Sequence, residues 1–222
     1  MSNTELVEGI GTCDPKFRLK FTPAPEALQM GAGPDIYRGI FAAVHHANRR
    51  STKDNLAAIV LPGARLTGEV AKGEQGFGDL GNSVVVFGSE DLLKRIKSDT
   101  RLAKHLGNGA LKTRLREVDA EEGEEGVALT RIRSWEKKTE GWHQRNEARR
   151  ARRAEHIAKT ANTQEGYAKP ARRDFFVQMG RASLDLAVHR GVYRGGTVEV
   201  NTYGLSRNGT PAFLPEFPDV GA

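Results

Sequence analysis

The chain has 222 residues, of which 38% are hydrophobic and 28% are charged, so it can form a sizeable core beneath a highly charged surface. No apolar run approaches the ~20 residues that a membrane-spanning helix requires, the N-terminus lacks the basic and apolar regions of a signal peptide, and the single cysteine, Cys13, excludes an internal disulfide and a cysteine-rich zinc site. These features predict a cytoplasmic protein, and the net charge of +6 predicts a polyanionic partner, either nucleic acid or an anionic membrane surface.

The hydrophobic pattern of the first half predicts alternating strands and helices after a loose leader over residues 1–15. Residues 17–21 alternate apolar and basic side chains, which is typical of a half-buried strand. In chain order we then expect a helix over 35–50, a buried strand over 55–61, a glycine-rich loop over 62–82, a strand over 83–87, a helix from the N-cap Ser89 to about His105, and a strand over 111–118. This β-α-β-β-α-β order predicts a ferredoxin-like domain over residues 16–118, a plan that many RNA-binding domains share.

The second half begins with an acidic linker over residues 119–126 and is predicted to form a C-terminal α/β part over residues 127–222. A strand over 127–133 precedes a basic helix over about 137–160, and a polar loop over 161–173 follows it. Three strand-like runs at 175–179, 183–189 and 197–202 and a turn-rich tail complete the chain. The predicted fold class is therefore α+β, with a ferredoxin-like N-terminal domain and a C-terminal part that carries an arginine-rich helix.

Basic residues concentrate in one stretch of the second half. Residues 131–173 contain thirteen Lys/Arg and only five Asp/Glu, whereas the rest of the chain carries a small net negative charge. Arginine dominates there, and its planar guanidinium group matches phosphates and guanine edges. The alternative is a solvated helix with a chance run of arginines, but the density of arginine and the scarcity of acids favour a binding surface.

Helical spacing places several of these basic residues on one face, with small alanines between them. Such a slim helix suits a nucleic-acid groove, either an RNA groove opened near a hairpin end or bulge, or the major groove of DNA. Against DNA, the chain shows no helix-turn-helix pair and no dimerising heptads. We expect RNA to be bound by Arg145, Arg149, Arg150, Arg152, Arg153 and His156.

Three separated motifs together resemble one known family. TYGLSRNG (residues 202–209), followed by PAFLPEF, resembles the closing motif of the CRISPR RNA-processing ribonucleases of type I-F systems and of their type IV relatives. FAAVHHAN (residues 41–48) resembles the first helix of that family, in which a histidine is catalytic, and the match places His45 there. TRIR (residues 130–133) resembles the strand end that reads the repeat hairpin, which implies RNA binding by Arg131 and Arg133.

The chain also departs from the family pattern. The type I-F members place a catalytic serine in a short loop of the C-terminal part, where this chain has QMGRASLDL and Ser183 is the nearest serine. The glycine-rich loop over 62–82 is longer than the family pattern predicts, and the acidic stretch is unfamiliar. These differences indicate a divergent branch such as a type IV relative.

The chemistry implied is RNA cleavage by the 2′-hydroxyl of the substrate itself, which leaves a 2′,3′-cyclic phosphate and a 5′-hydroxyl. A histidine suits the role of base because its pKa lies near working pH. His45 is the first candidate and His46 its rival. Tyr203 is a candidate to orient the histidine or the nucleotide, and Arg38, two helical turns before His45, is a candidate to steady the phosphate. The sequence suggests neither a carboxylate cluster for Mg²⁺ nor a zinc set, so we expect no metal and no cofactor.

The sequence therefore predicts a metal-independent endoribonuclease that cuts CRISPR repeat transcripts beside a hairpin and stays on the mature crRNA among other effector subunits, with no membrane partner. Two alternatives remain open from the residues. A non-catalytic RNA-binding ribonucleoprotein subunit would explain the basic helix and the ferredoxin-like plan equally well, but not the matched histidine with the YGLS turn. A basic DNA-binding regulator should prefer duplex DNA to hairpin RNA.

Overall fold

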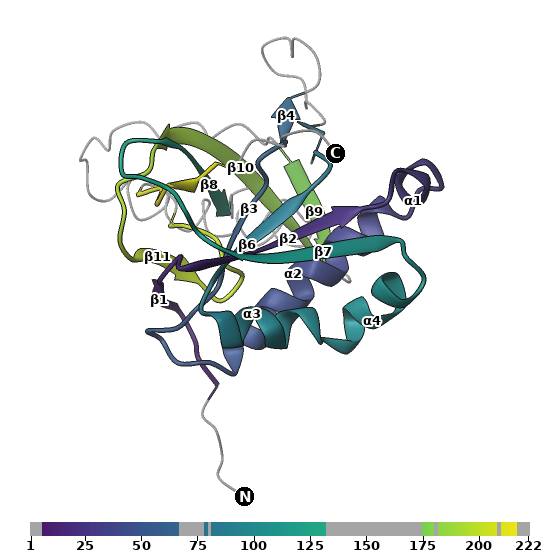
Figure 1. Ribbon diagram of the computed structural model, residues 1–222, viewed down its shortest axis with the longest axis horizontal. Coiled ribbons are helices and arrows are strands. Elements are labelled where there is room, and N and C mark those ends of the chain that lie inside the picture. The colour runs from purple at the N-terminus through teal and green to yellow at the C-terminus, as the bar shows by residue number, and fades with distance from the viewer. Residues whose placement is uncertain are drawn as a thin grey trace, which may run out of the picture.

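The computed structural model describes residues 6–66, 78–79, 81–131, 175–179, 182–207 and 210–216 (Figure 1). Within these ranges the fold is mixed α/β, with several antiparallel sheets and few helices. The predicted arginine-rich helix over 137–160 lies outside the described residues. No helix of the described ranges combines the length and the apolar character needed to cross a membrane.

The central sheet comes from the first half of the chain. It contains β2 (Phe17–Pro23), β3 (Ala58–Val60), β6 (Val84–Gly88) and β7 (Leu111–Glu117) in the order β3-β6-β2-β7, and every neighbouring pair is antiparallel. Side chains alternate between the two faces of a strand. Leu19 and Phe21 are buried on one face of β2, so Arg18 and Lys20 lie on the other.

Three helices, α2 (Gly33–Arg49), α3 (Glu90–Lys97) and α4 (Thr100–Gly107), lie on one side of this sheet (Figure 1). On α2, Ile36, Ile40, Phe41 and Val44 are fully buried, and their helical spacing forms the apolar stripe that packs on the sheet. The loop expected after β2 contains a short helix, α1 (Pro25–Gln29).

The single helix expected from Ser89 to about His105 is two helices. Asp99 interrupts it, because its Oδ1 accepts a hydrogen bond from the backbone nitrogen of Arg101 at 2.9 Å and so caps the start of α4. Ser89 does precede α3, but its hydroxyl donates to Oδ1 of Asn55 at 2.9 Å and makes no cap bond. The expected start of the helix and the N-cap position of Ser89 are therefore confirmed, although its side chain makes no cap hydrogen bond.

The second half contributes a second sheet with the order β12-β8-β10-β9. Its strands are β8 (Glu125–Arg131), β9 (Phe175–Met179), β10 (Ala182–Val192) and β12 (Leu214–Pro215). β8 begins inside the stretch expected as an acidic linker. The expected glycine-rich loop contains the short pair β4 (Arg65–Leu66) and β5 (Gly78–Asp79).

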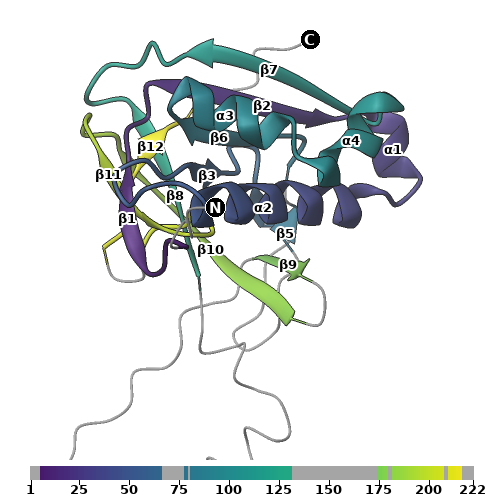
Figure 2. The ribbon, with the colours of Figure 1, turned by 90° about the horizontal axis from the view of Figure 1, so that it is seen from below.

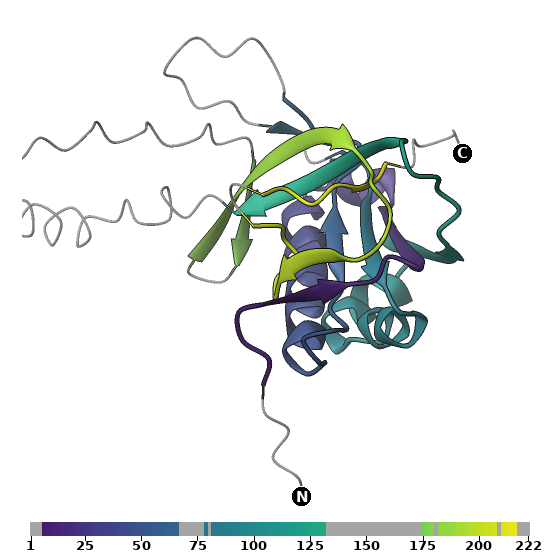
Figure 3. The same cartoon turned by 90° about the vertical axis from the view of Figure 1, so that its left-hand side faces the viewer.

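Part of the expected leader is also ordered. Ile10–Cys13 forms β1, which pairs antiparallel with β11 (Val198–Asn201), near the opposite end of the chain (Figure 3). The loose leader predicted over residues 1–15 is therefore wrong for this segment. Its pairing partner lies almost 190 residues away, so no local pattern announces it.

The two halves share their buried cores. One cluster joins the helices and the central sheet to Leu129, Leu186 and Leu205 of the second half. On the other face of the central sheet, Val85 and Phe87 pack with residues such as Val127 and Leu214. The strands of the second half are thus fixed against the first half, which brings the end of β8 and the turn after β11 to the end of α2.

Candidate active site around His45 and Tyr203

His45 lies in the last part of α2 and faces the second half of the chain. It is half-buried, and its Nδ1 lies 3.2 Å from the carbonyl oxygen of Thr202. A carbonyl oxygen can only accept a hydrogen bond, so Nδ1 carries the proton and donates it to Thr202. In the neutral ring the lone pair then belongs to Nε2, which is the nitrogen able to take a proton.

The ring of His45 stacks on the ring of Tyr203. The ring centroids are 4.0 Å apart and the planes differ by only 5°. The guanidinium carbon of Arg131, at the end of β8, lies 5.1 Å from the centroid of the same tyrosine ring. Three residues that the sequence analysis singled out, from three distant segments, therefore meet in one cluster.

The turn that carries Tyr203 is built by Asn201. The side-chain Oδ1 of Asn201 accepts hydrogen bonds from the backbone nitrogens of Tyr203 at 2.8 Å and Leu205 at 3.3 Å. The backbone of Asn201 also bonds Gly204 and Leu205, at 2.8 and 2.9 Å. An asparagine side chain that bonds its own backbone a few residues on is a recognised turn former. This turn fixes both the ring of Tyr203 and the carbonyl of Thr202.

Gly204 then anchors the turn to the central sheet. Its carbonyl accepts a hydrogen bond from the nitrogen of Ile59 in β3 at 2.8 Å. Its φ of +75° is a conformation that side chains disfavour, and a Cβ there would lie 2.9 Å from the carbonyl oxygen of Ala57. The glycine of the YGLS motif is therefore required both by backbone conformation and by close approach to β3.

Asn48, one helical turn after His45, is a site residue that the sequence reasoning missed. It is fully buried, and its amide bonds both the nitrogen of Ala57, at 2.7 Å, and the carbonyl of Ala57, at 2.9 Å. The same amide nitrogen lies 3.3 Å from the carbonyl of Thr202, so that oxygen accepts from both His45 and Asn48. The available sequence signal was a polar residue on the buried face of a helix. Its hydrogen-bond partners all lie outside that helix, so the sequence does not indicate them.

The surroundings of His45 favour its neutral form. Burial lowers the pKa of His45 below its usual value of 6.5, and the nearby positive charges of Arg49 and Arg131 lower it further, against the opposing effect of the Thr202 hydrogen bond. The imidazole is therefore neutral at pH 7 and able to accept a proton. Positive charge beside a neutral imidazole is also an arrangement that suits a phosphodiester substrate.

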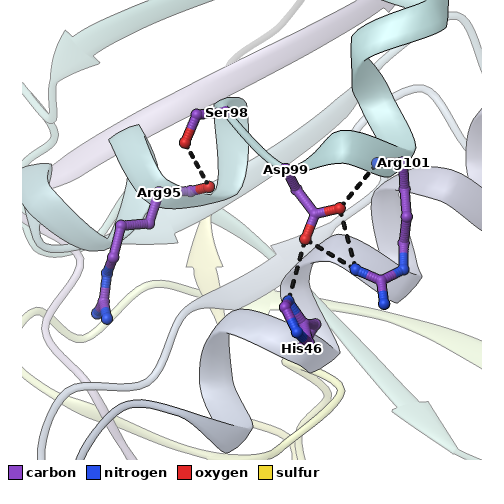
Figure 4. A network of polar contacts seen from close by, with 5 residues as sticks. All are labelled: His46, Arg95, Ser98, Asp99 and Arg101. Carbon is purple, nitrogen blue, oxygen red and sulfur yellow. Dashed lines mark hydrogen bonds and ion pairs between the residues drawn. The ribbon is translucent and has the colours of Figure 1, made fainter.

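His46, the rival candidate, is engaged elsewhere. Its Nδ1 lies 3.1 Å from Oδ2 of Asp99, and Asp99 also pairs with Arg101 at 2.9 Å (Figure 4). In the same region the Ser98 hydroxyl donates to the carbonyl of Arg95 at 3.1 Å. His46 thus links α2 to the beginning of α4, whereas His45 contacts Tyr203. This division favours His45 for the chemistry.

The remaining candidates are not all brought into the cluster. Arg38 is exposed, and its guanidinium pairs with Asp35 at 2.5 Å on the same helix. Arg38 precedes His45 by seven positions of helix, which is about 10 Å along the axis. The backbone of Ser183 lies in β10, opposite Gln178 of β9, rather than in a loop. Six further RNA-binding candidates and Arg133 lie outside the described residues: Arg145, Arg149, Arg150, Arg152, Arg153 and His156.

Among the described residues, no group of three or more His, Cys, Asp or Glu side chains is placed to hold a metal ion. Comparison of the sequence with protein-family models and with curated proteins finds no match. The site must therefore be interpreted from its own geometry.

Proposed function

We propose that this chain is a metal-independent endoribonuclease that cuts CRISPR repeat transcripts next to a hairpin and remains on the mature crRNA as a subunit of the effector complex. The observation that carries the proposal is the cluster of His45, Tyr203 and Arg131. A histidine whose Nδ1 is committed to a backbone carbonyl, whose ring is fixed by stacking and whose pKa is lowered has the properties of a general base.

The fold supports the same proposal. We interpret residues 16–118 as a ferredoxin-like domain, because the strand order β3-β6-β2-β7 is antiparallel and α2 and the pair α3 and α4 connect its strands on one side. The YGLS turn supports the resemblance to the type I-F and type IV processing ribonucleases, since its glycine and its tyrosine both have structural reasons to be there.

In the proposed reaction Nε2 of His45 takes the proton of the 2′-hydroxyl upstream of the cut. The 2′-oxygen attacks the phosphorus, the bond from phosphorus to the 5′-oxygen breaks, and the departing oxygen takes a proton from water. The products are a 2′,3′-cyclic phosphate and a 5′-hydroxyl. Tyr203 keeps the imidazole in place, which contributes because a catalytic group that is already oriented loses little freedom in the transition state.

Arg131 supplies positive charge at this point. Its guanidinium lies over Tyr203 and acts electrostatically on His45, which supports a role in contacting the nucleotide at the cut. Charge from a fixed guanidinium stabilises the phosphorane-like transition state more than a mobile counterion would. The arginine-rich segment predicted over 137–160 would hold the hairpin, and this role rests on its sequence pattern alone.

The test is incubation of the wild-type protein with a labelled repeat hairpin in EDTA, followed by analysis of the product ends. We expect cleavage on one side of the hairpin with a cyclic phosphate end and with product still bound. Tight hairpin binding without cleavage would instead indicate the non-catalytic ribonucleoprotein subunit. Preference for duplex DNA over hairpin RNA would indicate a DNA-binding regulator, and either result would overturn the proposal.

A further inference from the structure

A second basic surface lies on β2 and β7, away from the candidate active site. Both strands alternate apolar and basic residues, as FRLKFTP and LKTRLRE. The apolar positions, which include Leu19, Phe21, Leu111 and Leu115, pack toward the helices. Alternation therefore places all the basic residues of the two strands on the opposite face. We call this set the basic sheet face; its members are Arg18, Lys20, Lys112, Arg114 and Arg116.

Strand register places like charges directly opposite each other on this face. Arg18 pairs with Arg116, and Lys20 pairs with Arg114. Directly opposed like charges destabilise a sheet. The pKa of Arg18 is lowered first by its own partial burial and then by the positive charge of Arg114. A polyanion is attracted by such a concentration of like charge. Lys112, Arg114 and Arg116 are exposed, whereas Arg18 and Lys20 are half-buried.

The dimensions of the basic sheet face fit one nucleic-acid strand. Side chains on the same face of a strand repeat every ~6.8 Å, and adjacent strands are ~4.8 Å apart, so the cations form two columns over a length of about 14 Å. These two columns of cations together are similar in width to a single phosphate backbone, while the two backbones of a duplex lie farther apart. The neighbouring positions on this face, Val85 and Phe87, are buried beneath the second half of the chain, so the described residues present no aromatic ring there for base stacking.

The position of this surface separates it from the chemistry. β7 is the edge strand of the central sheet, while the turn around Gly204 docks on β3 at the other edge. Figure 2 shows β7 at the top of the molecule, and β9 and β10 at the bottom. The face also lies on the opposite side of the sheet from α2, which carries His45. RNA bound here is therefore not the segment being cut.

We propose that the basic sheet face binds the single-stranded flank of the same RNA whose hairpin meets the active site, through phosphates and without reading sequence. The identity of the strand as RNA rests on the proposed function, whereas binding of a single-stranded polyanion does not. Such a surface would retain the flank after cleavage and hold it at a fixed edge of the subunit.

The experiment measures binding of a short, unstructured oligouridine RNA, and of a hairpin with and without a single-stranded flank, over a range of salt. In the test variant Lys112, Arg114 and Arg116 are changed to Gln. In the control variant, three exposed cations on the helical side of the sheet are changed to Gln, which removes the same net charge. These residues of α3 and α4 are Arg95, Lys97 and Lys104. Circular dichroism and thermal melting check that both variants fold.

We expect the test variant to bind oligouridine more weakly. Its slope of log affinity against log salt should be smaller by about 0.7 for each phosphate that the three cations no longer neutralise, and so by about 2 in all. The control should keep the wild-type slope. The flank should strengthen hairpin binding in the control and contribute much less in the test variant.

Equal slopes in the two variants, no oligouridine binding by the wild type, or an equal contribution of the flank to hairpin binding in the two variants would each overturn the proposal. If the wild-type protein binds oligouridine but does not cleave the hairpin, the proposed function is overturned and the binding proposal for the basic sheet face is not.

Discussion

The substitution Gly204→Ala tests whether the YGLS turn is fixed by its contact with β3. Gly204 has a φ of +75° and a Cβ at that position would lie 2.9 Å from the carbonyl oxygen of Ala57 and 3.1 Å from the nitrogen of Ile59. Gly195 has nearly the same φ, +70°, but a Cβ there would have no neighbour within 4 Å. Gly195→Ala is therefore a control that carries the conformational cost without the steric one.

The expected loss of stability follows from comparing Gly204→Ala with Gly195→Ala. An alanine in the left-handed region costs about 1–2 kcal/mol, and both variants gain the same small benefit from a stiffer unfolded chain. Gly204→Ala must also displace the backbone of β3, and forcing atoms into a packed position typically costs about 1–3 kcal/mol more. We expect the free energy of unfolding of Gly204→Ala to be lower than that of Gly195→Ala by this additional amount.

Urea denaturation measures the difference, and single-turnover cleavage of a repeat hairpin measures its consequence. Displacement of the turn moves the Thr202 carbonyl and the Tyr203 ring together, so cleavage by Gly204→Ala should fall while Gly195→Ala cleaves like the wild type. Equal stability of the two variants would refute the argument that close approach to β3 fixes the turn. Unchanged cleavage in Gly204→Ala would show that the turn does not position His45.

Three further predictions concern the cluster itself. Tyr203→Phe should keep most of the cleavage rate because the stacked ring remains, whereas Tyr203→Ala should slow cleavage without a matching decrease in hairpin affinity; equal decreases in rate in both variants would assign the role to the hydroxyl. Because the pKa of His45 is lowered and the base acts when neutral, kcat/KM should decline only below about pH 6.5, and Arg49→Gln should move that midpoint upward while Arg50→Gln leaves it in place. Arg131→Ala should slow cleavage of every hairpin if the guanidinium meets the phosphate, whereas a decrease of about 1–3 kcal/mol in discrimination between cognate and base-swapped hairpins would show guanine reading.

Local patterns were enough to predict most elements of the fold. The alternation in residues 17–21 and the helical spacing of Ile36, Ile40 and Val44 predicted strand and helix correctly. The same patterns predicted an α+β fold, of which the combination of helices with antiparallel sheets is confirmed. Two predictions failed because hydrophobic periodicity does not show what determines the structure there. β1 depends on pairing with β11, and Asp99 divides the predicted helix by capping α4. Long-range pairing leaves no periodic signal, and a capping residue inside an apolar pattern is masked by that pattern.

The candidate site was also predicted from the sequence only in part. The motif match selected His45, Tyr203 and Arg131, which the structure brings together. It did not reveal Asn48 or the Thr202 carbonyl, because a backbone oxygen has no sequence signature and the partners of Asn48 lie at Ala57, just before β3, and in the turn. The choice between His45 and His46 also needed the structure, since adjacent histidines look alike until their partners are known.

The most direct test of the catalytic proposal compares His45→Ala with His46→Ala in cleavage and binding of a repeat hairpin in EDTA. Loss of a general base should slow cleavage by about 10²–10⁴-fold, and His45→Ala should do so with hairpin affinity nearly unchanged. His46→Ala should cleave like the wild type, because His46 bonds Asp99 instead of facing Tyr203. Wild-type protein should also fail to cut a hairpin with a 2′-deoxy sugar just upstream of the cut. Full activity of His45→Ala, or cleavage of the deoxy hairpin, would contradict 2′-hydroxyl attack assisted by His45.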